Sequence, residues 1–510
     1  EISTRDWSSD VCSSDLALLL MDLADQREGE EAVSRLINVL AQPLVSLPQP
    51  TSVSASVGIT LFPLDDANPD TLLRHADQAM YQAKQAGKNG YYVFNTAEDR
   101  FKREKHDHLA RLRLALDDDE FVLHYQPKVD MRRGQVVGLE ALIRWNHPQQ
   151  GLLAPAEFLP LIGYDDLICA IGQWVVETAL SQLEAWRALG LSLPVSVNIA
   201  SRHLQARDFV ETLQAALQRH PGAAGLLELE ILESAALEDM ASTSAVIERC
   251  QALGLHFSLD DFGAGYSSLS YLKRLPTETI KIDQSFVRDL LTDPDDLVIV
   301  RGVIGLARAF QRQVIAEGVE TAAHGTLLLQ LNCNLAQGFG IARPMPAERV
   351  PDWLRSWRPD PSWLAAKELF WEDEDYPLML VEIRARQWVQ QVLDAVAEGR
   401  PVPHEHFGDP HRCDFGHWYE GEGRRRYAHH AAFARIRAPH QRIHRVVERM
   451  DACWREGHIQ AMRDQVPELL AARDETLARL HELQQVSARH VPRLDHPLNA
   501  DGRPFDTANA

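Results

Sequence analysis

The sequence is poor in cysteine, in long apolar runs and in positive charge. Six cysteines are scattered over 510 residues, so no disulfide framework is indicated and a reducing cytoplasm fits the chain best. The sequence contains no run of about 20 apolar residues, so we predict no membrane span. A formal net charge of −21 argues against binding to duplex nucleic acid, which requires many lysines and arginines. We therefore expect a cytoplasmic protein, and tethering by a region that precedes this chain stays open.

Eight short apolar runs alternate with stretches of helical periodicity in the middle of the chain. The runs are residues 121–129, 137–145, 195–199, 227–232, 256–262, 279–283, 313–319 and 334–339. Between them, residues 173–189 and 298–310 carry apolar side chains at helical spacing. Strands that alternate with helices predict an α/β fold, and eight such strands predict a TIM-like β/α barrel.

Polar side chains occur at or near the ends of most of these runs. They are Glu140, Asn198, Glu230, Asp260, Asp261, Lys281 and Glu317. Most gaps between them are roughly one strand plus one helix long, and the strand ends of a barrel converge on one face. An oxygen-rich set favours Mg²⁺ or Mn²⁺ over zinc. The adjacent Asp260 and Asp261 can serve two cations about 3.5 to 4 Å apart, an arrangement that cleaves phosphodiester bonds.

The motifs around these residues resemble those of the EAL family. They are GLEALIRW, SVNIASRHL, LELEILES, SLDDFGAGYSSL, IKIDQSFV, IAEGVET and AQGFGIARP. The resemblance covers residues 108–358 and implies hydrolysis of cyclic di-GMP to pGpG with two Mg²⁺ or Mn²⁺ ions per site. It implies that Glu140, Asn198, Glu230 and Asp260 hold one ion, while Asp260, Asp261 and Glu317 hold the other.

The same resemblance implies further roles around the ligands. Lys281 is expected to orient the attacking water, and catalysis is expected to depend on Lys281, Glu317, Glu140 and Asp261. Arg144 and Gln337 match positions that contact substrate, Glu233 matches an acid that supports the DDFG loop, and Glu320 matches an acid behind the ligands. A barrel that binds cyclic di-GMP without cleaving it remains an alternative.

The first hundred residues have a different character. DWSSDVCSSDL resembles translated sequencing-adaptor DNA, so we expect residues 1–16 to be a non-native leader. Residues 17–97 resemble the C-terminal half of an α+β GGDEF diguanylate cyclase domain, through SVSASVGITLFP and DTLLRHADQAMYQAKQAGKNGYYVFN. The defining motif of that family is absent, so cyclase activity is not expected.

The composition changes again at residues 359–380, which we interpret as a connector. Residues 381–487 contain amphipathic helices and predict an all-α bundle of the four-helix type. His440 and His444 are four residues apart and share one helix face, and Cys413 adds a thiolate from HRCDFGHWY. Such a mixed set favours zinc. Through HRCDFGHWY, the following GEG and PHQRIH, the segment resembles the zinc-binding CZB family.

That family uses three histidines and one cysteine, and its first histidine corresponds to Ala385 in this chain. The fourth ligand therefore stays open between water, Glu382, His411 and His417. The resemblance implies that the bundle senses zinc or oxidants and regulates the barrel, and a protein that is mainly a metal or redox sensor is a further alternative. We also expect a homodimer, formed through the barrel or the bundle, and a disordered tail over residues 488–510.

Overall fold

The computed structural model describes residues 2–3, 16–42, 54–160, 162–163, 165–263, 272–366, 369–370, 375–403, 410–487 and 489–490. Most of the predicted leader (1–16) and of the predicted tail (488–510) lies outside these described residues. The chain divides into two compact units, Glu1–Leu114 and Ala115–Ala510. Within the described ranges, no helix combines the length and the apolar character that crossing a membrane requires.

The first unit is a small α+β fragment. Its elements are β1 (Ile2–Ser3), β2 (Ala17–Leu18), α1 (Gln26–Leu40), β3 (Val57–Ile59), α2 (Pro69–Gln85), β4 (Tyr91–Val93) and the start of α3 (Thr96–Asp117). Strands β3 and β4 pair in parallel. Val33, Ile37 and Ile59 form its buried apolar cluster, while Leu19 and Met21 are exposed. A core of this size removes little apolar surface from water.

The second unit begins with a closed barrel of eight strands. They are β5 (Phe121–Asp130), β6 (Gln135–His147), β8 (Val195–Ile199), β9 (Leu227–Leu232), β10 (His256–Phe262), β11 (Thr279–Ile282), β12 (Gln313–Ala316) and β13 (Leu335–Ala336). The predicted barrel is confirmed. Strands β6 and β8 to β13 run parallel to one another, but β5 is antiparallel to both β6 and β13. Only residues 131–134 connect β5 to β6, which is too short for the crossover that parallel strands require.

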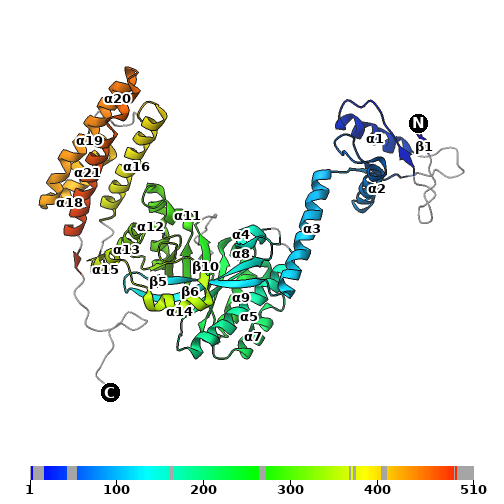
Figure 1. Cartoon of the computed structure of the whole chain (residues 1–510), viewed down its shortest axis with the longest axis horizontal. Coiled ribbons are helices and arrows are strands. Elements are labelled where there is room, and N and C mark those ends of the chain that lie inside the picture. Colours follow the sequence, from blue (N-terminus) through cyan, green and yellow to red (C-terminus); the bar gives the residue numbers. More distant parts are fainter. Residues whose placement is uncertain are drawn as a thin grey trace. The chain divides into compact units, whose positions relative to one another are not determined.

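Helices cover the outside of the barrel (Figure 1). The helices and short strands of this part are β7 (Gly151–Leu153), α4 (Pro155–Phe158), α5 (Leu167–Ala188), α6 (Ser201–Leu204), α7 (Phe209–Arg219), α8 (Glu233–Glu238), α9 (Met240–Gln251), α11 (Gln284–Arg288), α12 (Pro294–Ala309), α13 (Ala322–Gln330), β14 (Met345–Pro346) and α14 (Val350–Ser356). In α5, Val176, Leu180 and Leu183 are buried at helical spacing, which gives this helix one apolar face for the sheet.

The C-terminal part is helical, as predicted. Its elements are α15 (Pro361–Ala366), β15 (Leu369–Phe370), α16 (Tyr376–Glu398), α17 (Asp414–Trp418), the π-helical turn η4 (Tyr419–Gly423), α18 (Arg424–Tyr427), α19 (Ala431–Arg455), α20 (Ile459–Arg463), α21 (Val466–Ser487) and β16 (Arg489–His490). Helices α16, α19 and α21 lie alongside one another (Figure 1). Helix α16 begins inside the segment 359–380, before the predicted start of the bundle at residue 381.

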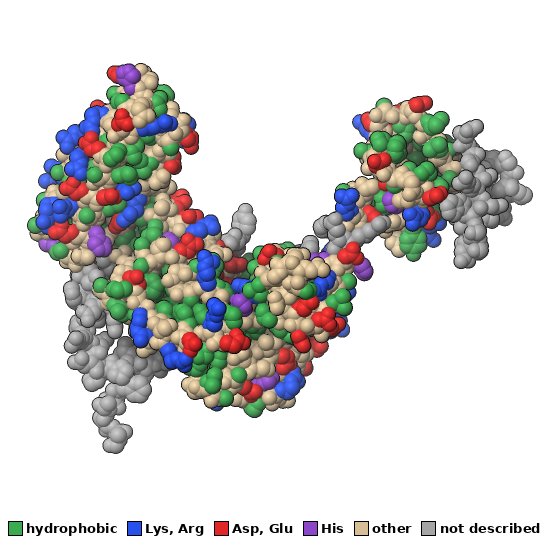
Figure 2. All heavy atoms as spheres, in the orientation of Figure 1, with side chains coloured by type: hydrophobic (Ala, Val, Ile, Leu, Met, Phe, Trp, Pro, Cys, Tyr) green, Lys and Arg blue, Asp and Glu red, His purple; other side chains and the backbone are tan. Residues whose placement is uncertain are grey.

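Apolar clusters and exposed ion pairs join the helices of the bundle. One cluster includes Phe415, Trp418 and Phe433, and the other includes Val389, Val446 and Met450. Acidic and basic side chains are interspersed over the surface of this part (Figure 2). They include the pairs Arg442–Glu475 and Arg449–Glu468, at 2.7 and 2.5 Å, which join α19 to α21. Such exposed pairs contribute little to stability, so the apolar clusters are the main source of cohesion between these helices.

Candidate functional site

The barrel gathers the predicted ligands at and near the carboxyl ends of its strands. Glu140 lies on β6, Asn198 on β8, Glu230 on β9, Asp260 and Asp261 on β10 and Lys281 on β11, and Glu317 directly follows β12. Glu140, Glu230 and Asp260 form one acidic cluster, and Asp260, Asp261 and Glu317 form a second. Within each cluster the ligand atoms all lie within 4.8 Å of one another. Asp260 belongs to both clusters.

The adjacent acids of β10 reach one site because the strand is irregular at this point. In a regular strand, successive side chains point to opposite faces of the sheet. The register of β10 against β11 shifts between Leu259 and Phe262, and Asp261 has a φ of 55°, in the left-handed region that non-glycine residues rarely adopt. The backbone N–H of Asp261 donates to Oδ1 of Asp260 at 3.1 Å. The irregularity brings the Asp261 carboxylate to the same side as that of Asp260.

The ammonium group of Lys281 lies among four of these carboxylates. Its Nζ is 2.6 Å from Glu230 and from Glu317, 3.1 Å from Asp260 and 3.5 Å from Glu140. The side chain is completely buried. Burial alone would lower the pKa of Lys281, but the surrounding carboxylates raise it well above its ordinary value. Lys281 therefore stays protonated in the folded chain.

The acids differ in how strongly they hold a proton. Burial, together with the charge of Glu230, raises the pKa of Glu140 to about 7. Burial and Asp260 raise the pKa of Asp261 to about 6. Burial would also raise the pKa of Glu230, but Lys281 and Lys128 outweigh it and hold that pKa at about 2. Burial is the largest cause of the raised pKa values of Glu140 and Asp261, and the neighbouring carboxylates add to it, so a cation at this site would favour the ionised forms.

The donor set fits hard divalent cations such as Mg²⁺ or Mn²⁺. Every candidate ligand supplies an oxygen atom, which such cations prefer. The two clusters contain five carboxylates, whereas the buried ammonium groups beside them are those of Lys281 and Lys128. Oε1 of Glu230 is buried and has no hydrogen-bond partner among the described residues, although Nζ of Lys128 lies 3.7 Å from it. A buried carboxylate oxygen without a hydrogen bond depends on nearby positive charge, so the excess of carboxylates over ammonium groups is what favours a bound cation.

Two amide side chains hold Glu140 in place. Nδ2 of Asn198 donates to Oε1 of Glu140 at 2.7 Å, so the amide predicted as a ligand lies directly beside the first acidic cluster. Nε2 of Gln337 donates to Oε2 of Glu140 at 2.5 Å and to Oε1 of Gln126 at 3.0 Å. Gln337, predicted as a substrate contact, is thus buried against a ligand carboxylate.

The remaining predicted residues lie around the two clusters. Arg144 lies further along β6 than Glu140, toward its carboxyl end, and donates through Nη1 to the carbonyl of Ile143 at 2.8 Å. Oε2 of Glu233 accepts from the backbone N–H of Gly263 at 3.0 Å, so this acid does contact the end of the DDFG segment. Glu320 is exposed and belongs to neither acidic cluster.

Lys128 is a site residue that the sequence reasoning missed. It is buried on β5, where Nζ lies 2.9 Å from Glu228, 3.1 Å from Oγ of Ser196 and 3.7 Å from Oε1 of Glu230. Gly138 leaves room for it, because a Cβ at that position would lie 3.2 Å from Cε of Lys128. The available signal was a lysine within the predicted strand of residues 121–129.

The bundle brings together the three side chains predicted to bind zinc. Sγ of Cys413 lies 3.4 Å from Nε2 of His440, and the Nε2 atoms of His440 and His444 lie 3.1 Å apart. Tetrahedral zinc with bonds of about 2.0 to 2.3 Å requires neighbouring ligand atoms about 3.3 to 3.6 Å apart. The observed spacings are close to that requirement, so these side chains fit a zinc ion.

Aromatic rings stack on both histidines, and burial favours the neutral form of His440. Phe415 stacks on His440 with the ring centroids 4.2 Å apart, and Trp388 stacks on His444 with the ring centroids 5.3 Å apart. Burial, His444 and His411 lower the pKa of His440 to about 3. A neutral imidazole is the form that binds metals. Ala385, one turn before Trp388, packs with Cys413 against the same apolar cluster.

Comparison with known families finds three matches along the chain. The EAL domain matches residues 109–344, the chemoreceptor zinc-binding domain matches residues 386–450, and the diguanylate cyclase GGDEF domain matches residues 5–90. The three resemblances found in the sequence are thereby confirmed. The GGDEF match includes part of the segment predicted to be a leader.

Among curated proteins, the bifunctional diguanylate cyclase/cyclic di-GMP phosphodiesterase MucR of Pseudomonas aeruginosa is 40% identical over 65% of this chain and 49% of its own length. The cyclic di-GMP phosphodiesterase PdeR of Escherichia coli is 38% identical over 66% of this chain and 51% of its own length. The chain thus spans about half the length of these relatives.

Among solved structures, the cyclic di-GMP complex of the PaMucR phosphodiesterase is 43% identical to this chain. It matches 48% of this chain and 99% of its own length, with a TM-score of 0.47. The family matches coincide with the segments in which the barrel and the zinc-type cluster occur. Over residues 109–344 the chain belongs to the EAL domain family, and it also carries GGDEF and chemoreceptor zinc-binding segments.

Proposed function

We propose that this chain hydrolyses cyclic di-GMP to pGpG at the acidic end of its barrel. The observation that carries the proposal is the pair of carboxylate clusters that share Asp260. The relatives MucR and PdeR, 40% and 38% identical, are named as cyclic di-GMP phosphodiesterases. The geometry of the carboxylate clusters and the similarity to these relatives together support a phosphodiesterase that uses two divalent cations.

We assign one Mg²⁺ or Mn²⁺ to Glu140, Asn198, Glu230 and Asp260, and the other to Asp260, Asp261 and Glu317. When bound, such a pair activates water and stabilises the charge of the attacking and leaving oxygens. The positions of Glu140, Glu230 and Asp260 favour this arrangement, because these side chains come from packed strands and are buried. Asp261, in the second cluster, is exposed and Glu317 is partly buried. Side chains that are already held in place by strands lose little conformational entropy when cations bind to them.

Lys281 acts as a hydrogen-bond donor in this proposal. Its raised pKa keeps the ammonium protonated, so it orients the attacking water and stabilises developing negative charge instead of accepting a proton. Arg144 lies near the carboxyl end of β6 and provides a guanidinium for the phosphates of the dinucleotide. Gln337 acts mainly through Glu140, which it contacts at 2.5 Å.

We assign a regulatory role to the bundle. A zinc ion held by Cys413, His440 and His444 would tie the segment before α17 to α19, and a zinc-bound thiolate reports both metal supply and oxidants. The measurement is the rate of hydrolysis by the full chain and by Cys413→Ala, each with and without added zinc. Equal rates throughout would remove the regulatory role and leave the hydrolase proposal standing.

The test of hydrolysis uses the purified full chain and cyclic di-GMP. With Mg²⁺ or Mn²⁺ we expect pGpG to accumulate, as separated by chromatography, and we expect the chelator EDTA to stop it. The Asp260→Asn chain serves as the matched inactive protein. Binding of cyclic di-GMP without any pGpG in either metal would instead identify a receptor.

A further inference from the structure

The zinc-type cluster of the bundle has three protein ligands in place, and its fourth ligand is open. A structural zinc site is closed by four protein ligands in a tetrahedron. The family position for the missing histidine is Ala385, whose methyl group cannot bind a metal. Trp388 on the same helix stacks on His444, so α16 reaches the cluster but contributes no ligand from that position.

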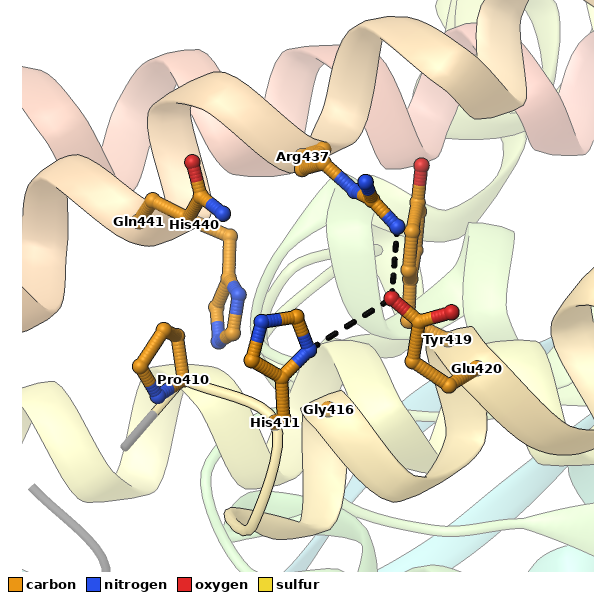
Figure 3. Close-up of a pocket in the computed structure, with 8 residues that line it drawn as sticks. All are labelled: Pro410, His411, Gly416, Tyr419, Glu420, Arg437, His440 and Gln441. Carbon is orange, nitrogen blue, oxygen red and sulfur yellow. Dashed lines mark hydrogen bonds and ion pairs between the residues drawn. The ribbon is translucent and has the colours of Figure 1, made fainter.

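We infer that His411 supplies the fourth ligand of this chain through its Nε2 atom. His411 precedes Cys413 by two residues and lines the same small cavity as His440. In Figure 3 its ring lies between the ring of His440 and the carboxylate of Glu420. The inference rests on the proposed binding of zinc by the bundle and adds to it the identity of the ligand that replaces the family histidine.

Glu420 orients the His411 ring for this role. Nδ1 of His411 lies 3.5 Å from Oε1 of Glu420, and the opposite edge of the ring, which carries Nε2, is turned toward His440 (Figure 3). Histidines that bind metals commonly direct their second nitrogen to a carboxylate, which fixes the tautomer and the ring. Glu420 is itself held by Arg424 at 3.0 Å and by Arg437 at 2.6 Å.

The other candidates for the fourth position are less well placed. Oε1 of Glu382 accepts from Arg386 at 2.7 Å, and its Oε2 accepts from Gln484 at 2.7 Å. His417 is exposed on α17. His411 lies outside the three-residue set whose ligand atoms are within 4.8 Å of one another, but its side chain is 55% exposed. Its side chain can therefore move closer to the other three ligands without disturbing the apolar core, while the ring keeps the orientation that Glu420 gives it.

The test is the zinc affinity of the full chain, measured by competition with a chromophoric chelator. We expect His411→Ala to weaken zinc binding at least about tenfold, as loss of a ligand or its orienting partner does. The matched control is His417→Ala, an exposed histidine of the same segment, which we expect to bind zinc as the parent does. In the His411→Ala chain, adding Ala385→His should restore the affinity by supplying a ligand from the family position.

A second readout is spectroscopic. Cobalt placed in the site gives visible absorption that responds to the ligand set, so we expect His411→Ala to change this spectrum and His417→Ala to leave it unchanged. Unaltered zinc affinity and cobalt spectrum in His411→Ala would overturn the inference. The Cys413→Ala chain tests the zinc site itself, independently of the role of His411. If this chain binds zinc as the parent does, the proposed zinc site fails as a whole. Circular dichroism checks that each variant is folded, which we expect because His411 is largely exposed.

Discussion

Nζ of Lys281 lies 2.6 Å from Oε2 of Glu230, and both side chains are completely buried. Neither charge has bulk water to stabilise it, so each depends on the other and on the groups around them. The pair lies where the two acidic clusters meet. Three of the predictions below concern the groups that share this site.

The first prediction concerns Lys281 itself. Lys281→Ala should lower kcat far more than it weakens binding of cyclic di-GMP, because the ammonium is assigned to water and to charge that develops in the transition state. Measurements of kcat and of the dissociation constant for the dinucleotide check this. A variant with weak binding and an unchanged kcat would make Lys281 a substrate clamp. Lys281→Met, which retains more of the buried volume, guards against simple unfolding.

The second prediction concerns Asp260. Asp260→Asn removes a negative charge from both cation positions, so turnover should fall at least about a hundredfold, since metal catalysis contributes several kcal/mol. Glu320→Gln is the matched control, because Glu320 is exposed and belongs to neither acidic cluster. The kcat values of both variants, each compared with that of the parent chain, test this prediction. Equal losses, or an active Asp260→Asn chain, would contradict the two-cation assignment.

The third prediction concerns the stability of the barrel. Lys128→Met leaves Glu228 and Glu230 without their shared partner, and breaking a buried pair typically costs about 3 to 5 kcal/mol. Part of the loss should return in the double variant Lys128→Met/Glu228→Gln, which removes the charge of Glu228, whereas Glu230 keeps its contact with Lys281. Arg133→Met is the control, since Arg133 is 75% exposed and exposed pairs contribute little. Urea denaturation of the four chains measures the effect, and equal stability of Lys128→Met and Arg133→Met would refute it.

The fourth prediction concerns acid stability. Burial lowers the pKa of His203 to about 4, and His203 is 4% exposed. Between about pH 6.5 and 4 the unfolded chain binds a proton here that the folded chain does not, so stability falls as the pH falls through this window. The shift corresponds to about 3 kcal/mol at most. His203→Leu should flatten this part of the pH profile of the melting temperature, and the exposed His256→Leu should not. A profile that His203→Leu leaves unchanged would contradict the assignment.

Much of the barrel follows from the sequence because its signal is periodic. Eight apolar runs predicted eight strands, and convergence of strand ends predicted that Glu140, Glu230 and Asp260 would meet. The antiparallel direction of β5 was missed, although the short connection over residues 131–134 carried the signal. Lys128 was missed because a lysine inside an apolar run ordinarily marks a strand edge, and only the closed barrel shows that its partners lie on β8 and β9.

The zinc-type cluster of the bundle could likewise be predicted from the sequence only in part. His440 and His444 were predicted to share a helix face from their spacing alone, and the structure places their Nε2 atoms 3.1 Å apart. The proximity of Cys413 depends on how the segment before α17 packs against α19, which no local pattern encodes. The environment of His411 depends in addition on the π-helical turn that carries Glu420.

At Asp261, the left-handed backbone conformation lowers the stability of the fold, while the carboxylate belongs to the proposed cation site. A non-glycine residue with this conformation costs roughly 1 to 2 kcal/mol, whereas glycine adopts it freely. Asp261→Gly should therefore raise the melting temperature while it removes one carboxylate from the second acidic cluster. Directed evolution of this chain for heat resistance alone would enrich that substitution at the expense of the proposed hydrolysis, so a thermostability screen needs a parallel assay of cyclic di-GMP cleavage.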